Sequence, residues 1–189
     1  MHTAIKMKKE LKNVIVLPEN VHLKLERDSV AVKGPLGESV KRFNFKNINV
    51  ALKDGNLELW HEKATKKEKK IMNSIASEIS SMIDGAVKGF EYKLQVCSTH
   101  FPVTIKVDEK NRVLSIKNFL GENKDRVVRL KKNVDVKVEG DIIVVKSIDK
   151  DSAGQTAADI ENATKVSAKD RRIFQDGIWI IQKEKGRRK

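Results

Sequence analysis

Cysteine, aromatic residues and long apolar runs are scarce in this 189-residue chain, and each scarcity excludes a class of protein. The single cysteine, Cys97, cannot form an intramolecular disulfide, which fits a reducing compartment and predicts a cytosolic location. No run of 18 apolar residues is present, so no transmembrane helix is expected. The first twelve residues lack the apolar core of a secretory signal, which is therefore not expected either. Aromatic residues make up 5% of the chain, so aliphatic side chains must fill most of the core.

Residue patterns typical of catalysis and metal binding are also lacking. Cys97 and His100 lie three positions apart, a spacing shared by half of a metal site and by a Cys–His nucleophile pair. A zinc site needs further Cys or His ligands at matching spacing, and the other three histidines are scattered. The glycine-containing stretches lack the spacing of a P-loop or a Rossmann fingerprint. The pattern favours packed residues at a domain junction for Cys97 and His100, and it predicts no enzyme activity, no catalytic residue, no cofactor and no metal.

Acidic residues are outnumbered by basic ones, and the excess is unevenly distributed. The chain contains 39 Lys and Arg against 26 Asp and Glu, a net charge of +13. An excess of this size predicts an anionic partner, of which nucleic acid is the commonest. Residues 99–164 are almost neutral, whereas residues 165–189 carry nine basic and three acidic side chains. The basic terminal block is therefore predicted to contact phosphates.

An internal repeat divides the chain into two similar parts. KGPLGE (33–38) and KNFLGE (117–122) lie 84 positions apart, and other matches keep this register. Self-similarity at a fixed period indicates one structural unit used twice. Both parts show alternating apolar segments, then a helical pattern, then one more segment expected to be a strand. This order predicts an α+β fold with two tandem copies of a small domain, each a mostly antiparallel sheet packed against one helix.

The repeat also predicts where the domains begin and end. We expect a basic leader (1–13), a first domain (14–98), a second domain (99–182) and a basic C-terminal tail (183–189). Residues 90–96 and 178–181 are expected to be the closing strands of the first and second copy. GPLG and NFLG are expected to break the sheet at the same corner of each copy, because proline cannot donate to a strand ladder and glycine permits a positive φ.

One helix is predicted in each copy. Thr65 and Glu68 form a capping-box pattern before the first. Its buried face is expected to carry Ile71, Ile75, Ile79, Met82 and Ala86. The second helix is expected to run from Asp151 or Ser152, which would cap it, to about Thr164, with an inner face of small residues.

Basic clusters carry the remaining functional signal. Positive charge at a helix start opposes the helix dipole, yet Lys63, Lys66, Lys67, Lys69 and Lys70 crowd the start of the first predicted helix. Two interpretations remain open: phosphate contact that offsets this penalty, and a merely solvated helix end. Aromatic platforms for single-stranded bases are not evident, so the pattern favours shape recognition of folded RNA.

Five segments, taken in order and with their spacing, resemble a known family. They are VKGPLGE (32–38), GFEYK (89–93), HFP (100–102), NFLGE (118–122) and DRRIFQDGIW (170–179). From about Val14 to Lys183 the chain resembles ribosomal protein number six of the large subunit in universal naming, number nine in eukaryotic naming. The last segment is similar to the archaeal and eukaryotic branch.

The resemblance implies a structural constituent of the large subunit of the cytosolic ribosome. It implies binding to ribosomal RNA near the stalk base and the sarcin–ricin loop, beside neighbouring ribosomal proteins and translational GTPases. The alternative from another class is a free-standing RNA-binding assembly or regulatory factor of the same fold. HEKATKKEKK after Trp60 departs from the Trp-Gly-Asn-Arg-like sequence expected there, which leaves RNA contact by that loop open.

The resemblance and the basic clusters together yield a set of candidate RNA-binding residues. Those carried over from the family are Asn118, Gly121, Arg126, Arg129, Lys169, Arg171 and Arg172. The cluster after the second glycine stretch adds Lys131 and Lys132, and the tail adds Lys183, Lys185, Arg187, Arg188 and Lys189.

Overall fold

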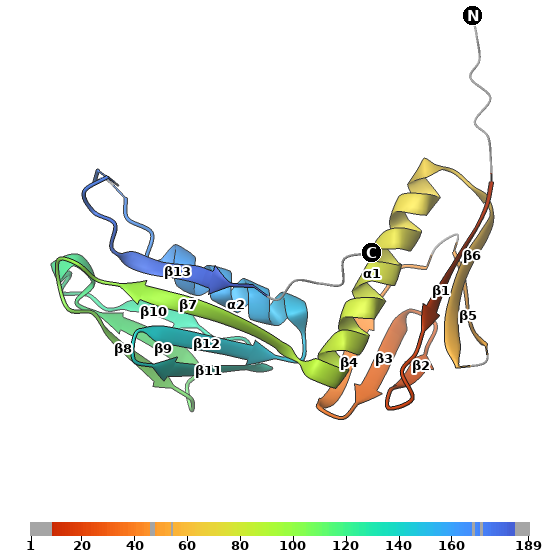
Figure 1. Ribbon diagram of the computed structural model, residues 1–189, viewed down its shortest axis with the longest axis horizontal. Helices are drawn as coiled ribbons and strands as arrows, with labels where there is room; N and C mark the ends of the chain where they lie inside the picture. The colour runs from red at the N-terminus through yellow and green to blue at the C-terminus, as the bar shows by residue number, and fades with distance from the viewer. Residues whose placement is uncertain (1–8, 46–47, 54, 168, 171, 184–189) are drawn as a thin grey trace, which may run out of the picture. The chain divides into compact units, whose positions relative to one another are not determined.

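The chain forms two compact units, Met1–Lys88 and Gly89–Lys189 (Figure 1). The structure, a computed structural model, describes residues 9–45, 48–53, 55–167, 169–170 and 172–183. Within each unit the strands form two antiparallel sheets, and one helix packs against them.

The first unit contains two three-stranded sheets in its described residues. Its strands are β1 (Lys9–Val16), β2 (His22–Leu25), β3 (Ser29–Gly34), β4 (Gly37–Arg42), β5 (Asn49–Lys53) and β6 (Asn56–Ala64). They pair in the orders β1-β6-β5 and β2-β3-β4. The helix α1 (Lys66–Lys88) contacts strands of both sheets, so it closes the core of this unit.

The second unit contains a three-stranded and a four-stranded sheet. Its strands are β7 (Phe90–Cys97), β8 (Thr104–Asp108), β9 (Val113–Lys117), β10 (Arg126–Arg129), β11 (Val134–Glu139), β12 (Ile142–Ser147) and β13 (Gly177–Gln182). They pair in the orders β10-β9-β8 and β11-β12-β7-β13. A short 3-10 turn, η1 (Phe119–Gly121), lies between β9 and β10, and the helix α2 (Lys150–Ala163) precedes β13.

The two units repeat one plan, which confirms the predicted α+β fold in two copies. Strand pairing β1-β6-β5 corresponds to β7-β12-β11, and β2-β3-β4 corresponds to β8-β9-β10. β3 and β9 begin at Ser29 and Val113, 84 positions apart, and α1 and α2 begin at Lys66 and Lys150, also 84 apart. Each copy has two small sheets rather than the single sheet expected.

The position of residues 90–97 differs from the expectation, and the boundary between the copies moves with it. β7 lies between β12 and β13, so it opens the second unit instead of closing the first. Alternation predicts a strand but not its partners, which are chosen by cross-strand packing such as that of Leu94 with Ile143. The division therefore falls between Lys88 and Gly89, and β13 has no counterpart among the described residues of the first unit. Lys9–Asn13, expected in the leader, are part of β1.

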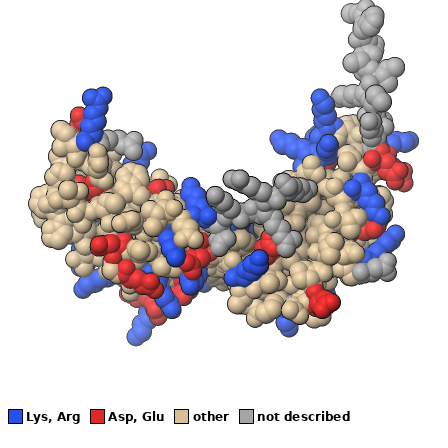
Figure 2. All heavy atoms as spheres, in the orientation of Figure 1, with Lys and Arg blue, Asp and Glu red and all other residues tan. Residues whose placement is uncertain are grey.

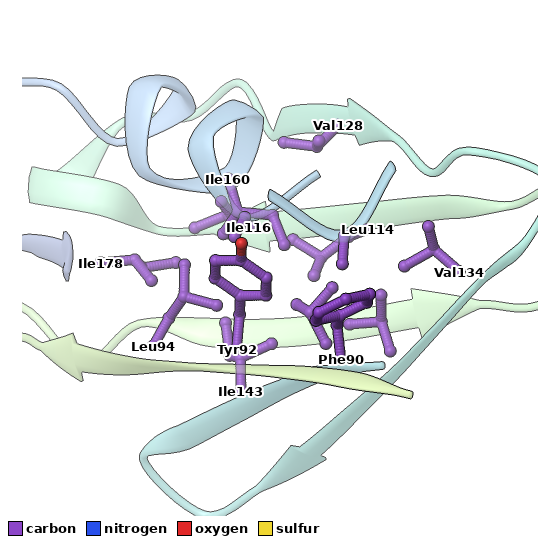
Figure 3. Packing of buried hydrophobic residues seen from close by; sticks show 14 of the residues in the cluster. Phe90, Tyr92, Leu94, Leu114, Ile116, Val128, Val134, Ile143, Ile160 and Ile178 are labelled. Carbon is purple, nitrogen blue, oxygen red and sulfur yellow. The ribbon is translucent and has the colours of Figure 1, made fainter. Parts of the chain in front are cut away.

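A core of aliphatic side chains lies between the two sheets and α2 of the second unit (Figure 3). Tyr92 and Leu94 point from β7 toward Leu114 and Ile116 on β9, and Ile160 of α2 covers them. All but Tyr92 have no exposed surface, and Tyr92 is only 8% exposed. Removing apolar surface from water is the main favourable contribution to folding. The core therefore holds the strands in place, and with them the ends of the loops that connect them.

Both predicted helices are present, with small differences at their starts. The Thr65 amide donates to Glu68 Oε2 at 2.9 Å, which confirms the capping box of α1. Ile71 is 36% exposed, whereas the neighbouring Met72 is buried. Asp149, not Asp151 or Ser152, caps α2, because its carboxylate accepts the Ser152 amide at 3.1 Å.

Candidate nucleic-acid interface

Four loops gather at one end of the second unit, where the candidate residues are densest (Figure 1). They are the segment after β7, the η1 segment between β9 and β10, the segment after α2 and the segment before β13. Hydrogen bonds join these loops to one another. The surface at this end of the unit is therefore formed by segments that are distant in sequence and are joined by hydrogen bonds.

His100 and Asp176 tie the segment after β7 to the segment before β13. Asp176 is 2% exposed and accepts hydrogen bonds from the amides of Thr99 at 2.5 Å and His100 at 3.1 Å. Its other carboxylate oxygen lies 2.5 Å from His100 Nδ1, and the imidazole stacks on Phe174 with centroids 4.9 Å apart. Burial pushes the pKa of Asp176 up, but these hydrogen bonds outweigh it and hold the pKa below its ordinary value.

This pairing replaces the domain-junction role expected for His100. The junction lies at residues 88–89, and His100 belongs to a loop inside the second unit. Cys97 ends β7 half-buried, and its sulfur makes no hydrogen bond with His100 among the described contacts.

The second glycine stretch adopts a left-handed backbone that contacts the segment after β7. Asn118, Leu120 and Gly121 have φ values of 57°, 51° and 75°. Asn118 Nδ2 donates to the carbonyl of Pro102 at 3.0 Å, and a β carbon on Gly121 would lie 3.4 Å from the Phe101 ring. The stretch is thus shaped by contacts with the segment after β7.

Arg126 joins η1 to the end of α2. Its Nε and Nη2 donate to the Glu122 carboxylate at 2.8 and 2.6 Å, and its Nη1 donates to the carbonyls of Ala163 and Lys165 at 2.8 and 3.3 Å. The guanidinium lies 4.3 Å from the centroid of the buried Phe119 ring. The hydrogen bonds with Glu122 raise the pKa of Arg126 and lower that of Glu122. Arg126 was predicted to contact RNA, but its guanidinium N–H groups donate to acceptors inside the unit.

The remaining candidates fall into separate places. Lys169 and Arg172 are exposed in the segment before β13, and Lys165, which the sequence interpretation missed, is exposed in the segment after α2. Arg129 ends β10, three residues beyond Arg126, and Lys131 and Lys132 follow it, exposed. Lys183 follows the far end of β13. Arg171, Lys185, Arg187, Arg188 and Lys189 lie outside the described residues.

No group of three or more His, Cys, Asp or Glu side chains that could hold a metal ion is present in the part of the chain that the structure describes. Among the same residues, no helix has the length and apolar character needed to cross a membrane.

Comparisons with known proteins identify the family. The sequence model described as "Ribosomal protein L6" matches residues 101–177. "Large ribosomal subunit protein uL6" of Desulfurococcus amylolyticus is 41% identical over 170 residues, which cover 89% of this chain and 92% of that protein. The protein of the same name from Staphylothermus marinus is 45% identical over 170 residues, covering 88% and 91%. That of Methanosarcina mazei is 40% identical over 177 residues, covering 94% and 99%.

The chain belongs to the ribosomal protein L6 family. It is accordingly a large-subunit ribosomal protein, a structural constituent of the ribosome and not an enzyme. The predicted resemblance and its archaeal and eukaryotic branch are confirmed. Association with large-subunit ribosomal RNA and with other ribosomal proteins follows from membership of the L6 family.

The lysine cluster at the start of α1 is a feature of this L6 chain that stays without an assigned role. Figure 2 shows basic side chains gathered over this end of the helix. Lys63, Lys66, Lys67, Lys69 and Lys70 are all exposed, and none has an ion-pair partner among the described residues. Glu68, in their midst, is held by Thr65, and its hydrogen bonds lower the pKa of Glu68 to about 2.

Proposed function

We propose that this L6 protein binds large-subunit ribosomal RNA near the stalk base and the sarcin–ricin loop through the four-loop end of its second unit. The observation that supports it is the combination of fixed loops and exposed cations. Asp176, Glu122 and Arg126 form hydrogen bonds inside the unit and fix its loops. Lys165, Lys169 and Arg172 are exposed on the same loops.

The proposed mechanism is electrostatic docking onto a folded RNA. Lys and Arg that neutralise phosphates release counterions, so affinity falls steeply as salt rises. Phosphate contacts set position and orientation and carry little sequence information, which suits a protein that recognises one RNA shape. Arg129, Lys131 and Lys132 at the far end of β10 and the tail from Lys183 are further proposed contacts. Asn118, Gly121 and Arg126 serve in this proposal as the frame that shapes the loops.

Paired charge-reversal variants test the interface. Lys169→Glu/Arg172→Glu is expected to weaken binding to deproteinised large-subunit ribosomal RNA and to flatten the salt dependence of the dissociation constant. Lys106→Glu/Lys110→Glu, exposed on β8 and the turn after it, carries the same charge change and is the matched control. Equal losses in both variants would contradict the assignment of this end.

Chemical footprinting of assembled large subunits tests the location. Subunits that lack the protein should show raised reactivity at the stalk base and the sarcin–ricin loop, where translational GTPases are proposed to act nearby. Protection confined to other regions would overturn the location but leave RNA binding intact.

The tail has its own experiment. Removing residues 183–189 is expected to weaken RNA binding and to reduce the salt slope, since fewer counterions are released. An unchanged slope would contradict a role of the tail in the interface.

The rival function, a free-standing assembly factor, predicts that a high-salt wash strips the protein from large subunits, whereas a structural constituent stays in stoichiometric amount.

A further inference from the structure

A cavity of about 650 Å³ lies at the four-loop end of the second unit. It opens beside the outer edge of β13, between the C-terminal end of α2 and the segment before β13. The aromatic residues Phe174 and Trp179 and the amide residues Asn162 and Gln175 are among those that line the cavity. Small-molecule sites commonly have volumes of about 300–1,000 Å³, so a single planar ring system fits.

Backbone amides on the outer edge of β13 already have hydrogen-bond acceptors, so a strand of another molecule cannot pair with this edge beside the cavity. The amide of Ile178 donates to Thr164 Oγ1 at 2.9 Å, and that of Ile180 donates to Glu161 Oε1 at 3.3 Å. Side chains of α2 and of its C-cap, Thr164, thus satisfy outward-facing donors of an edge strand. An occupant of the cavity has to be recognised through side chains and ring faces instead.

Trp179 forms a platform in the cavity wall. A β carbon on Gly177 would lie 3.1–3.2 Å from three atoms of the indole, so the ring packs directly against the bare backbone of this glycine. The residue nevertheless stays 40% exposed. An aromatic ring supported on one side and open on the other is the arrangement on which nucleobases stack.

Side chains of both charges lie at the cavity. Lys165 lines it, and Lys169 places its ammonium 4.6 Å from the centroid of the Phe174 ring. Glu161 and the buried Asp176 also line it, so a phosphate is repelled by these carboxylates and attracted to the exposed lysines. Neutral N–H donors, such as those on nucleobase edges, suit acceptors in the wall. A lysine or arginine of another protein would be repelled by Lys165 and Lys169.

We propose that the cavity beside Trp179 takes one unpaired nucleobase of the bound RNA, stacked on the indole, while its phosphate lies on Lys165 and Lys169. The inference rests on the proposed RNA-binding function and deepens it. It adds a specific contact with an extruded base to a surface otherwise recognised by shape and charge.

Indole fluorescence tests this directly in the full chain. In Trp60→Phe, Trp179 is the only tryptophan. A 12-nucleotide single-stranded RNA and deproteinised large-subunit ribosomal RNA are expected to quench it, and a fully paired RNA duplex of equal length is not. Quenching by a Lys/Arg-rich peptide but by neither RNA would overturn the proposal in favour of a protein side chain.

Substitutions at the platform supply the affinity readout. Trp179→Ala is expected to weaken binding of both RNAs about tenfold, which is about 1.4 kcal/mol. Trp179→Phe should recover part of the loss because it keeps an aromatic face. Ile181→Ala, two residues further along β13 and 54% exposed, is the matched control and is expected to stay within about twofold of the parent, since no contact with the cavity is lost.

Cys97 gives a second measurement that needs no change at Trp179. It lines the same cavity and is the only cysteine, so bound single-stranded RNA is expected to slow its alkylation by iodoacetamide several-fold. Unchanged indole fluorescence and alkylation at RNA concentrations that saturate binding would overturn the base pocket and leave the proposed function standing. Failure of the parent protein to bind ribosomal RNA at all would instead overturn the proposed function.

Discussion

Gly34 packs directly against Ala86: a β carbon at position 34 would lie 2.7 Å from the carbonyl oxygen and 2.8 Å from the β carbon of Ala86. The same carbonyl accepts the amide of Leu36 at 3.1 Å. Gly34 and Gly37 face each other across β3 and β4, so GPLG is a tight hairpin turn docked on the last turns of α1. It was expected to break the sheet, and it connects two paired strands instead.

Gly34→Ala is therefore expected to destabilise the first unit by about 1–3 kcal/mol, because the clash is with helix backbone that has little freedom to move. Urea denaturation followed through the fluorescence of Trp60 in a Trp179→Phe background measures the change. Leu36→Ala, in the same turn but 52% exposed, is the control and should alter stability by less than about 0.5 kcal/mol. Equal stability of Gly34→Ala and the parent would contradict the close approach.

Arg126→Ala is expected to destabilise the second unit by about 1–2 kcal/mol. The change removes charge-assisted hydrogen bonds to Glu122 and to the carbonyls of Ala163 and Lys165, and the partial exposure of the side chain reduces their contribution to stability. Arg126→Lys should not restore stability, because an ammonium lacks the planar fork that reaches both partners. Thermal denaturation compares these variants with Arg129→Ala, an exposed arginine three residues away whose loss should be nearly neutral.

The capping box predicts a pH dependence of the first unit. Hydrogen bonds from Thr65 lower the pKa of Glu68 from 4.5 to about 2, so the folded state holds the proton less tightly than the unfolded chain does. The stabilisation is therefore present above pH 4.5 and is lost as the pH falls from about 4.5 to about 2. The stability difference between the parent and Glu68→Gln should shrink over this window. Glu62→Gln, which removes an exposed carboxylate of β6 by the same substitution, is the matched control.

The lysines at the start of α1 oppose the helix dipole, so reversing their charge should stabilise the helix. Lys66→Glu/Lys67→Glu is expected to raise the stability of the first unit by about 0.5–1 kcal/mol at low salt, and less at high salt. Lys88→Glu, the same change in the last turn of the same helix, is expected to lower it. RNA affinity of the first variant then separates the two interpretations of the cluster. A loss favours phosphate contact, and no change favours a solvated helix end.

Much of the local structure could be predicted from the sequence. Thr65 and Glu68 predicted the start of α1, because a capping box depends on residues three apart in one helical turn. The 84-residue period predicted two copies of one fold, since equal patterns of alternation and turns build equal elements. The candidate basic residues came from the charge clusters and from the family resemblance, and those described mostly lie exposed, as their strong hydration requires.

The partners of these elements could not be predicted in the same way. Residues 90–97 alternate as any strand does, and only packing in three dimensions assigns them to the second unit. Glu122 lies only four residues from Arg126, but the carbonyls of Ala163 and Lys165 that also hold Arg126 lie 37 and 39 residues away, and the sequence does not indicate that they meet it. Trp179 belongs to a short apolar segment and to the family-like segment 170–179, but its place in the sequence does not show that its ring lies beside a cavity also lined by Glu161 and Asn162 of α2. Secondary structure depends on neighbours within a few residues, whereas these assignments depend on contacts between segments up to about 80 residues apart, which come together only when the core closes.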